Sequence, residues 1–69
     1  MAVDMSRAVW WQSLEMHLQA ARVHEESADL LNSSGDVASA MRASEFAATE
    51  REAYAALLAR HPEWDPDGP

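Results

Sequence analysis

Two stretches with a seven-residue repeat of apolar and small side chains flank Gly35, and this arrangement restricts the chain to a helical hairpin. The first repeat runs through Trp10, Leu14, His17, Ala21, His24, Ala28 and Leu31. The second runs through Val37, Ala40, Ser44, Ala47, Arg51, Tyr54 and Leu58. Steps of three and four residues place such side chains on one face of an α-helix. Two such faces joined by a short turn predict antiparallel helices that pack along their length.

The signals for helix ends set the expected boundaries. Asp4 and Ser6 are both suitable N-caps for a first helix over about residues 4–33. Ser34-Gly35-Asp36 predicts the turn, because glycine can end one helix and aspartate can cap the next. The second helix is expected over about residues 37–61, since Pro62 disfavours its continuation. The fold class is therefore all-α, with one hairpin domain at 1–61.

The antiparallel register places small residues of the two helices at matching levels. Ala21 meets Ala47 and Ala28 meets Ala40, which allows the helix axes to approach to about 8 Å. The predicted inter-helix seam consists of Trp10, Leu14, Ala21, Ala28, Leu31, Val37, Ala40, Ala47, Tyr54 and Leu58. Arg51 also falls on this face. We expect it to pair with Glu15, with Glu25 or at the opposing level of His17, because a buried cation needs a partner.

A second apolar stripe lies on the first helix, nearly opposite Leu14. It consists of Met5, Val9, Met16, Val23 and Leu30. A helix that is apolar on two faces packs on two faces, and one intramolecular partner covers only one of them. The stripe therefore predicts an intermolecular protein interface. The alternative is that these are singly exposed apolar residues, which are normal on protein surfaces.

The small size of the chain also favours assembly. A fold of 69 residues without cysteine gains no stability from disulfides or thiolate metal sites. Association is the remaining source of stability, and we expect a homo-oligomer, with a dimeric four-helix bundle preferred. In length and plan such a hairpin is similar to the small dimeric plasmid regulators of the Rop type, and the similarity concerns architecture alone.

The charge of the chain excludes several partners. It carries 12 acidic residues against 5 basic ones, a net charge of −7, so direct binding of nucleic acid or of an anionic membrane is not expected. No segment is apolar enough to span a membrane, and the N-terminus does not resemble a signal peptide. We therefore expect a cytoplasmic protein. The bias towards alanine and arginine, with no lysine or isoleucine, resembles GC-rich bacterial coding, as in actinobacteria or their phages.

His17 and His24 are the candidate metal ligands of the chain. Seven residues of helix separate them by roughly 10 Å, so a single ion requires a second subunit to bridge that distance. The competing interpretation is that both histidines lie in the seam and form hydrogen bonds with Ser44, Glu25 or a partner. No serine–histidine–acid arrangement and no cofactor motif is present, so we expect a non-enzymatic protein without a cofactor.

Residues 62–69 form an acidic tail with three prolines, for which we expect no regular structure. Trp64 is its one aromatic residue. It is either an anchor for a partner protein or a residue that folds back onto Trp10 and Trp11, and we favour the second, because an antiparallel hairpin places both ends together.

The turn region resembles a tetratricopeptide repeat. Leu31, Gly35, Val37, Ala40 and Ala47 match that pattern, whereas Ala28, Ser44 and Glu52 depart from it. The resemblance covers about 35 residues and implies shared helix packing only, since repeat proteins need about three units to stand alone.

These observations predict a self-associating hairpin that acts as a small scaffold or regulatory adaptor. The alternatives are an obligate partner or inhibitor of another protein, such as an antitoxin or a phage-encoded inhibitor, and a metal-binding helical bundle.

Overall fold

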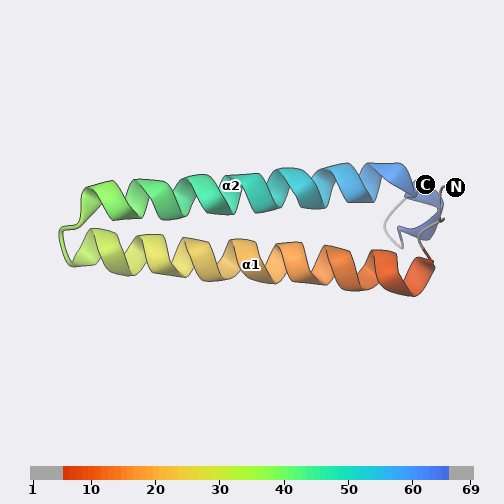
Figure 1. The fold of residues 1–69 in the computed structure, drawn as a ribbon, viewed down its shortest axis with the longest axis horizontal. Helices are drawn as coiled ribbons and strands as arrows, with labels where there is room; N and C mark the ends of the chain where they lie inside the picture. Colours follow the sequence, from red (N-terminus) through yellow and green to blue (C-terminus); the bar gives the residue numbers. More distant parts are fainter. Residues whose placement is uncertain (1–5, 66–69) are drawn as a thin grey trace, which may run out of the picture.

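Two long antiparallel helices form nearly all of the described structure. The computed structural model describes residues 6–65, with α1 at Arg7–Ser33, α2 at Val37–Arg60 and a short 3-10 helix, η1, at Pro62–Trp64. The helices lie side by side, with the turn at one end and both ends of the chain at the other (Figure 1). The expected all-α hairpin is therefore confirmed. Within residues 6–65, neither helix has the length and apolar character needed to cross a membrane.

The turn satisfies the backbone groups at the end of α1. The Gly35 amide donates to the Asn32 carbonyl at 3.1 Å, and the Asp36 amide donates to the Leu31 carbonyl at 2.9 Å. This pair of hydrogen bonds is the Schellman motif, which requires a left-handed residue at its second-last position. Gly35 supplies it with φ +86°. The sequence prediction of a glycine turn is therefore confirmed.

Both helices begin at side-chain caps. The Ser6 hydroxyl accepts a hydrogen bond from the Val9 amide at 3.2 Å. Ser6 is therefore the N-cap of α1, and Asp4 lies outside the described residues. The Asp36 carboxylate accepts from the Ser39 amide at 3.1 Å and caps α2. These caps satisfy amides that have no partner within the helix.

The Asp36 cap is expected to make the stability of the hairpin pH-dependent. Hydrogen bonding to the side chain and then the amide of Ser39 lowers the pKa of Asp36 below its ordinary value of 3.8. A lowered folded-state pKa gives stability that is present above pH 3.8 and is lost as the pH falls through the lowered value. Thermal melting of Asp36→Asn should lack this contribution to the acid dependence while keeping the cap. Identical acid profiles for Asp36→Asn and wild type would contradict it.

The buried core is narrow and consists mainly of alanine. It contains Trp10, Leu14, Ala21 and Ala28 from α1, and Ala40, Ala43 and Ala47 from α2. Leu31, Tyr54 and Leu58 of the predicted seam are half-buried. An alanine side chain removes little apolar surface from water, so the long contact between the helices yields little hydrophobic stabilisation.

The seam of α2 consists partly of other residues than the sequence predicts. Ala43 is buried where the predicted repeat has Ser44, and the half-buried Glu50 takes the place of Arg51. Val37, predicted to lie in the seam, is 58% exposed. Val37, Ser44 and Arg51 are seven residues apart and share one flank of α2. That flank faces outwards in the structure. The neighbouring repeat, through Ala43 and Glu50, places a small alanine at the contact between the helices and leaves the Arg51 guanidinium in water.

Candidate protein interface

The stripe predicted from α1 lies on the surface of the hairpin. Its large apolar side chains are exposed by 47% at Val9, 66% at Met16, 55% at Val23 and 72% at Leu30. Met5, the remaining member of the prediction, lies outside the described residues. Four large apolar side chains at one heptad position form a continuous line along α1, and such a line is more than the isolated exposed residues of an ordinary surface.

Phe46 of α2 extends the stripe across the hairpin. Its ring stacks on the His24 ring, with centroids 5.4 Å apart and planes inclined by 30°, and it is still 59% exposed. His24 borders the flank of α1 that carries Met16 and Val23. The stack therefore places Phe46 on the same side of the hairpin as the stripe. We name this side the apolar face, which consists of Val9, Met16, Ala20, Val23, Leu30, Phe46 and Ala53.

The flanks of the two helices differ in charge. On the apolar face, α1 presents two heptad positions that carry no charge: Val9, Ser13, Met16, Ala20, Val23, Ser27 and Leu30. The corresponding positions of α2 carry arginine at 42 and 60 and no carboxylate. The opposite flank of α1 carries Glu15, Arg22, Glu25 and Asp29. Glu25 pairs there with Arg51 of α2. Apart from Glu50 in the seam, the carboxylates of α1 and α2 therefore lie outside the flanks that form the apolar face.

The Glu25–Arg51 pair corrects one prediction and confirms another. Glu25 is one of the expected partners of Arg51, so that pairing is confirmed. The expected burial is wrong, since the Arg51 side chain is 51% exposed. An ion pair this exposed contributes little to stability. The pair does show that the Glu25 flank of α1 and the Arg51 flank of α2 lie on the same side of the hairpin.

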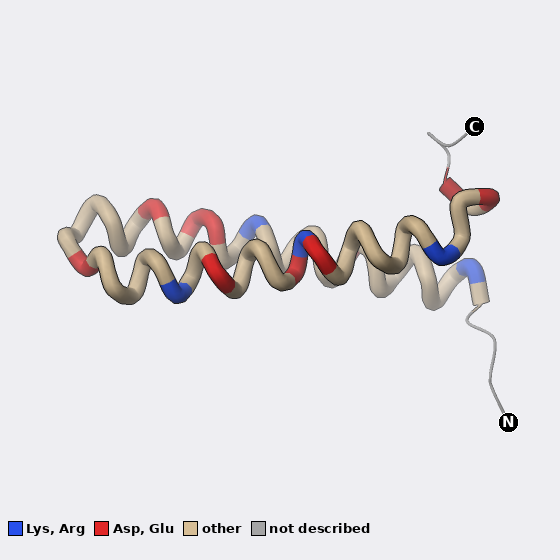
Figure 2. The backbone as a smooth tube through the Cα atoms, turned by 90° about the horizontal axis from the view of Figure 1, so that it is seen from above, with Lys and Arg blue, Asp and Glu red and all other residues tan. Residues whose placement is uncertain are grey.

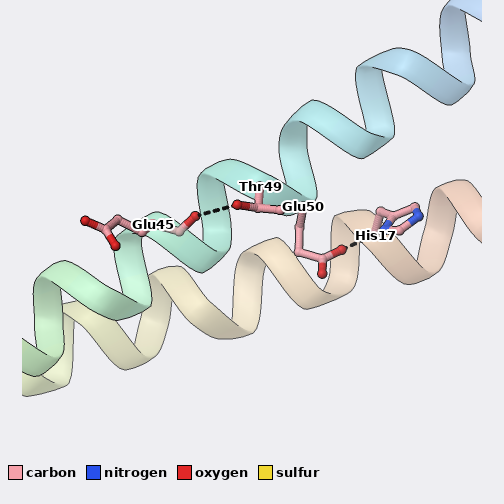
Figure 3. A network of polar contacts seen from close by, with 4 residues as sticks. All are labelled: His17, Glu45, Thr49 and Glu50. Carbon is pink, nitrogen blue, oxygen red and sulfur yellow. Dashed lines mark hydrogen bonds and ion pairs between the residues drawn. The ribbon is translucent and has the colours of Figure 1, made fainter.

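His17 forms a polar contact across the seam. Its Nδ1 atom lies 2.6 Å from Oε2 of Glu50, and both side chains are about 30% exposed. Figure 3 shows the two side chains meeting between the helices, with the Thr49 hydroxyl donating to the Glu45 carbonyl on the far side of α2. The predicted partners Ser44 and Glu25 were wrong for His17, because the seam of α2 presents Glu50 at this level.

The two candidate metal ligands are engaged separately. His17 contacts Glu50, whereas His24 stacks on Phe46. Among residues 6–65, no group of three or more histidine or acidic side chains converges as a metal site would require. The structure therefore does not bring His17 and His24 together.

The open end of the hairpin is held by an aromatic cluster around Trp10. The Trp10 side chain is fully buried, and its Nε1–H donates to the Leu57 carbonyl at 2.7 Å. The Trp11 and Trp64 rings pack edge-on against it at 5.2 and 5.5 Å. Figure 2 shows that the stretches of the two helices at this end, residues 8–14 and 53–59, carry no charged residue. The cluster fastens α1 to the last turn of α2.

Trp64 folds back onto this end as the sequence interpretation favoured. Its ring stacks on His61 with centroids 3.8 Å apart, and hydrogen bonding to the His61 side chain lowers the pKa of Glu63. The prediction that the tail forms no regular element is wrong for η1. Pro62 supplies a backbone angle suited to the start of a short helix, and the Trp64 ring finds an apolar surface. Residues 66–69 of the predicted tail lie outside the described residues.

Removing Trp64 is expected to weaken the hairpin without unfolding it. Trp64→Ala loses one edge-on aromatic contact with Trp10, and such pairs contribute about 0.5–1.5 kcal/mol. A chain that ends at His61 should show a similarly small decrease in melting temperature, because the truncation removes the same contact between Trp64 and Trp10. Loss of all helical signal in the truncated chain would contradict this prediction.

The geometry defines an antiparallel helical hairpin with an exposed apolar face along α1. No protein-family model, curated protein or solved structure matches the chain.

Proposed function

We propose that this protein is a non-enzymatic, self-associating helical hairpin that acts through protein–protein contacts as a small scaffold or regulatory adaptor. The observation that supports the proposal most is the mismatch between its core and its surface. The buried core contains five alanines beside Trp10 and Leu14, while Val9, Met16, Val23 and Leu30 remain exposed. Burying one such large side chain contributes about 1.5–3 kcal/mol, so covering these four by association would add apolar stabilisation that a core built mainly of alanine lacks.

A dimer that forms a four-helix bundle is the assembly we propose. Two hairpins stacked through their apolar faces give each helix a second packing surface, as in known bundles. We place the protein in the cytoplasm and propose proteins as its partners. Its net charge of −7 favours protein over nucleic acid as the target.

The opposite flank of α2 supports a second candidate function. Val37 and Met41 are 58% and 60% exposed there, and a dimer formed through the apolar face leaves both uncovered. They would serve as anchors for an unrelated protein, which makes the chain an obligate partner or an inhibitor. Aggregation of the purified chain when no partner is present would favour this function over self-association.

Val23→Glu tests the proposal. A carboxylate at the centre of the stripe would lose its solvation in a dimer interface, so we expect a monomer with a reduced melting temperature. The wild-type melting temperature should rise with protein concentration, as it does when association stabilises the folded state. A wild-type melting temperature that does not change with concentration, and that Val23→Glu leaves unaltered, would reject self-association.

A further inference from the structure

We propose that a second copy of this chain covers the apolar face in antiparallel orientation, with α1 packed on α1 of the partner and the two-fold axis passing near Ala20. This inference rests on the proposed self-association and adds which face is used and in which direction the copies run.

Charge explains why a second copy fits this face. Two copies each bring a net charge of −7, so they associate most readily where neither copy presents a carboxylate. Glu50 is the carboxylate of the seam that borders the apolar face, and it is bound to His17. The opposite flank of α1 carries three carboxylates, at Glu15, Glu25 and Asp29, beside one arginine, Arg22. Packing two such flanks together would bring mainly like charges into contact, which destabilises an interface.

The stripe is self-complementary when the two α1 helices are antiparallel. In a two-fold interface, residue i contacts residue j while j contacts i. The stripe has equal spacing about its midpoint, which lies beside Ala20. Antiparallel packing therefore places Val9 on Leu30 and Met16 on Val23, each contact occurring twice. Ala20 at the centre allows the helices to approach closely.

The distribution of charge along the hairpin also favours the antiparallel arrangement. Residues 25–31 of α1 include Glu25, Glu26 and Asp29, whereas residues 8–14 are uncharged (Figure 2). Antiparallel packing places residues 25–31 of each copy against the uncharged residues 8–14 of the other. Parallel packing would bring residues 25–31 of the two copies together.

Phe46 lies beside the proposed axis. Its stack on His24 places it about one helical turn from Ala20, so the two copies contribute two Phe46 rings close to the centre of the interface. A substitution at Phe46 therefore alters this part of the interface twice, once in each copy. Met41 is a matched control, because it lies on the same helix with 60% exposure against 59% for Phe46, but on the opposite flank.

Sedimentation equilibrium of Phe46→Glu and Met41→Glu tests which face is used. We expect Phe46→Glu to raise the dimer dissociation constant at least about tenfold and Met41→Glu to leave it within about twofold. The reverse ranking, or equal effects, would overturn the assignment of the face while self-association stands. A wild-type chain that sediments as a folded monomer would instead reject the proposed function. Far-ultraviolet circular dichroism identifies any variant that loses its helices, in which case Phe46→Ser replaces it.

Single cysteines test the direction of the copies, because the chain has no cysteine of its own. With a short bifunctional maleimide, Ala20→Cys should crosslink to itself. Leu30→Cys should not crosslink to itself, but it should crosslink to Val9→Cys in a mixture of the two. Met41→Cys should give no crosslink. Efficient self-crosslinking of Leu30→Cys would show parallel copies and overturn the proposal, as would a failure of Ala20→Cys to crosslink in a sample shown to be dimeric.

Discussion

Trp10→Ala is expected to unfold most of the protein at room temperature. The side chain is fully buried, and it donates a hydrogen bond to the Leu57 carbonyl of the last turn of α2. Replacing a buried tryptophan by alanine costs about 3–5 kcal/mol. A core of this size rarely provides more than about 3–5 kcal/mol in total, so the loss is comparable to the whole stability of the hairpin.

Urea denaturation followed by circular dichroism measures this effect. Trp11→Ala is the control, because Trp11 packs edge-on against Trp10 and is only half-buried. It should lower the midpoint of unfolding far less than Trp10→Ala does. A midpoint for Trp10→Ala equal to that of the wild type would show that the aromatic cluster does not hold the two helices together.

Ala47→Leu is expected to have the second largest effect. Ala47 is 4% exposed and lies at the level where α1 contributes Ala21. A larger side chain forces the helices apart and costs about 1–3 kcal/mol through overpacking. The neighbouring variant Ala48→Leu is the control, since Ala48 is exposed and a leucine there meets no facing helix. A melting temperature lowered by Ala48→Leu and unchanged by Ala47→Leu would show that the helices pack on a different face.

The sequence alone predicted the architecture because every local signal favours the same structure. Each signal predicts one feature. The heptad repeat predicts α1, the glycine predicts the turn, and the caps at Ser6 and Asp36 predict where the two helices begin. The α1 side of the seam was predicted equally well, because the repeat places Trp10, Leu14, Ala21 and Ala28 on one face, and all four are buried.

The sequence could not predict which residues of α2 lie in the seam. Ala40, Ala47 and Tyr54 belong to two overlapping repeats, one through Ser44 and Arg51 and the other through Ala43 and Glu50. Alanine is so frequent in α2 that hydrophobicity does not separate them. The choice depends on the closeness of the helices and on the polar contact between His17 and Glu50, both of which are properties of the packed pair.

The candidate interface was predicted only in part, for a similar reason. The spacing of Met16, Val23 and Leu30 revealed the stripe on α1. The position of Phe46 on the same side of the hairpin depends on how α2 is rotated, which its stack on His24 shows. The η1 helix was missed because a proline-rich acidic segment carries no periodic signal, although Trp64 provides the apolar contact that orders it.

The central claim is that this hairpin associates with a second copy of itself. Sedimentation equilibrium of the full wild-type chain over a wide concentration range tests it most directly. The mass should approach twice that of the 7.6 kDa chain as concentration rises, with a dissociation constant that increases in Val23→Glu. A mass that remains at 7.6 kDa throughout, in a sample that keeps its full helical signal, would contradict the claim.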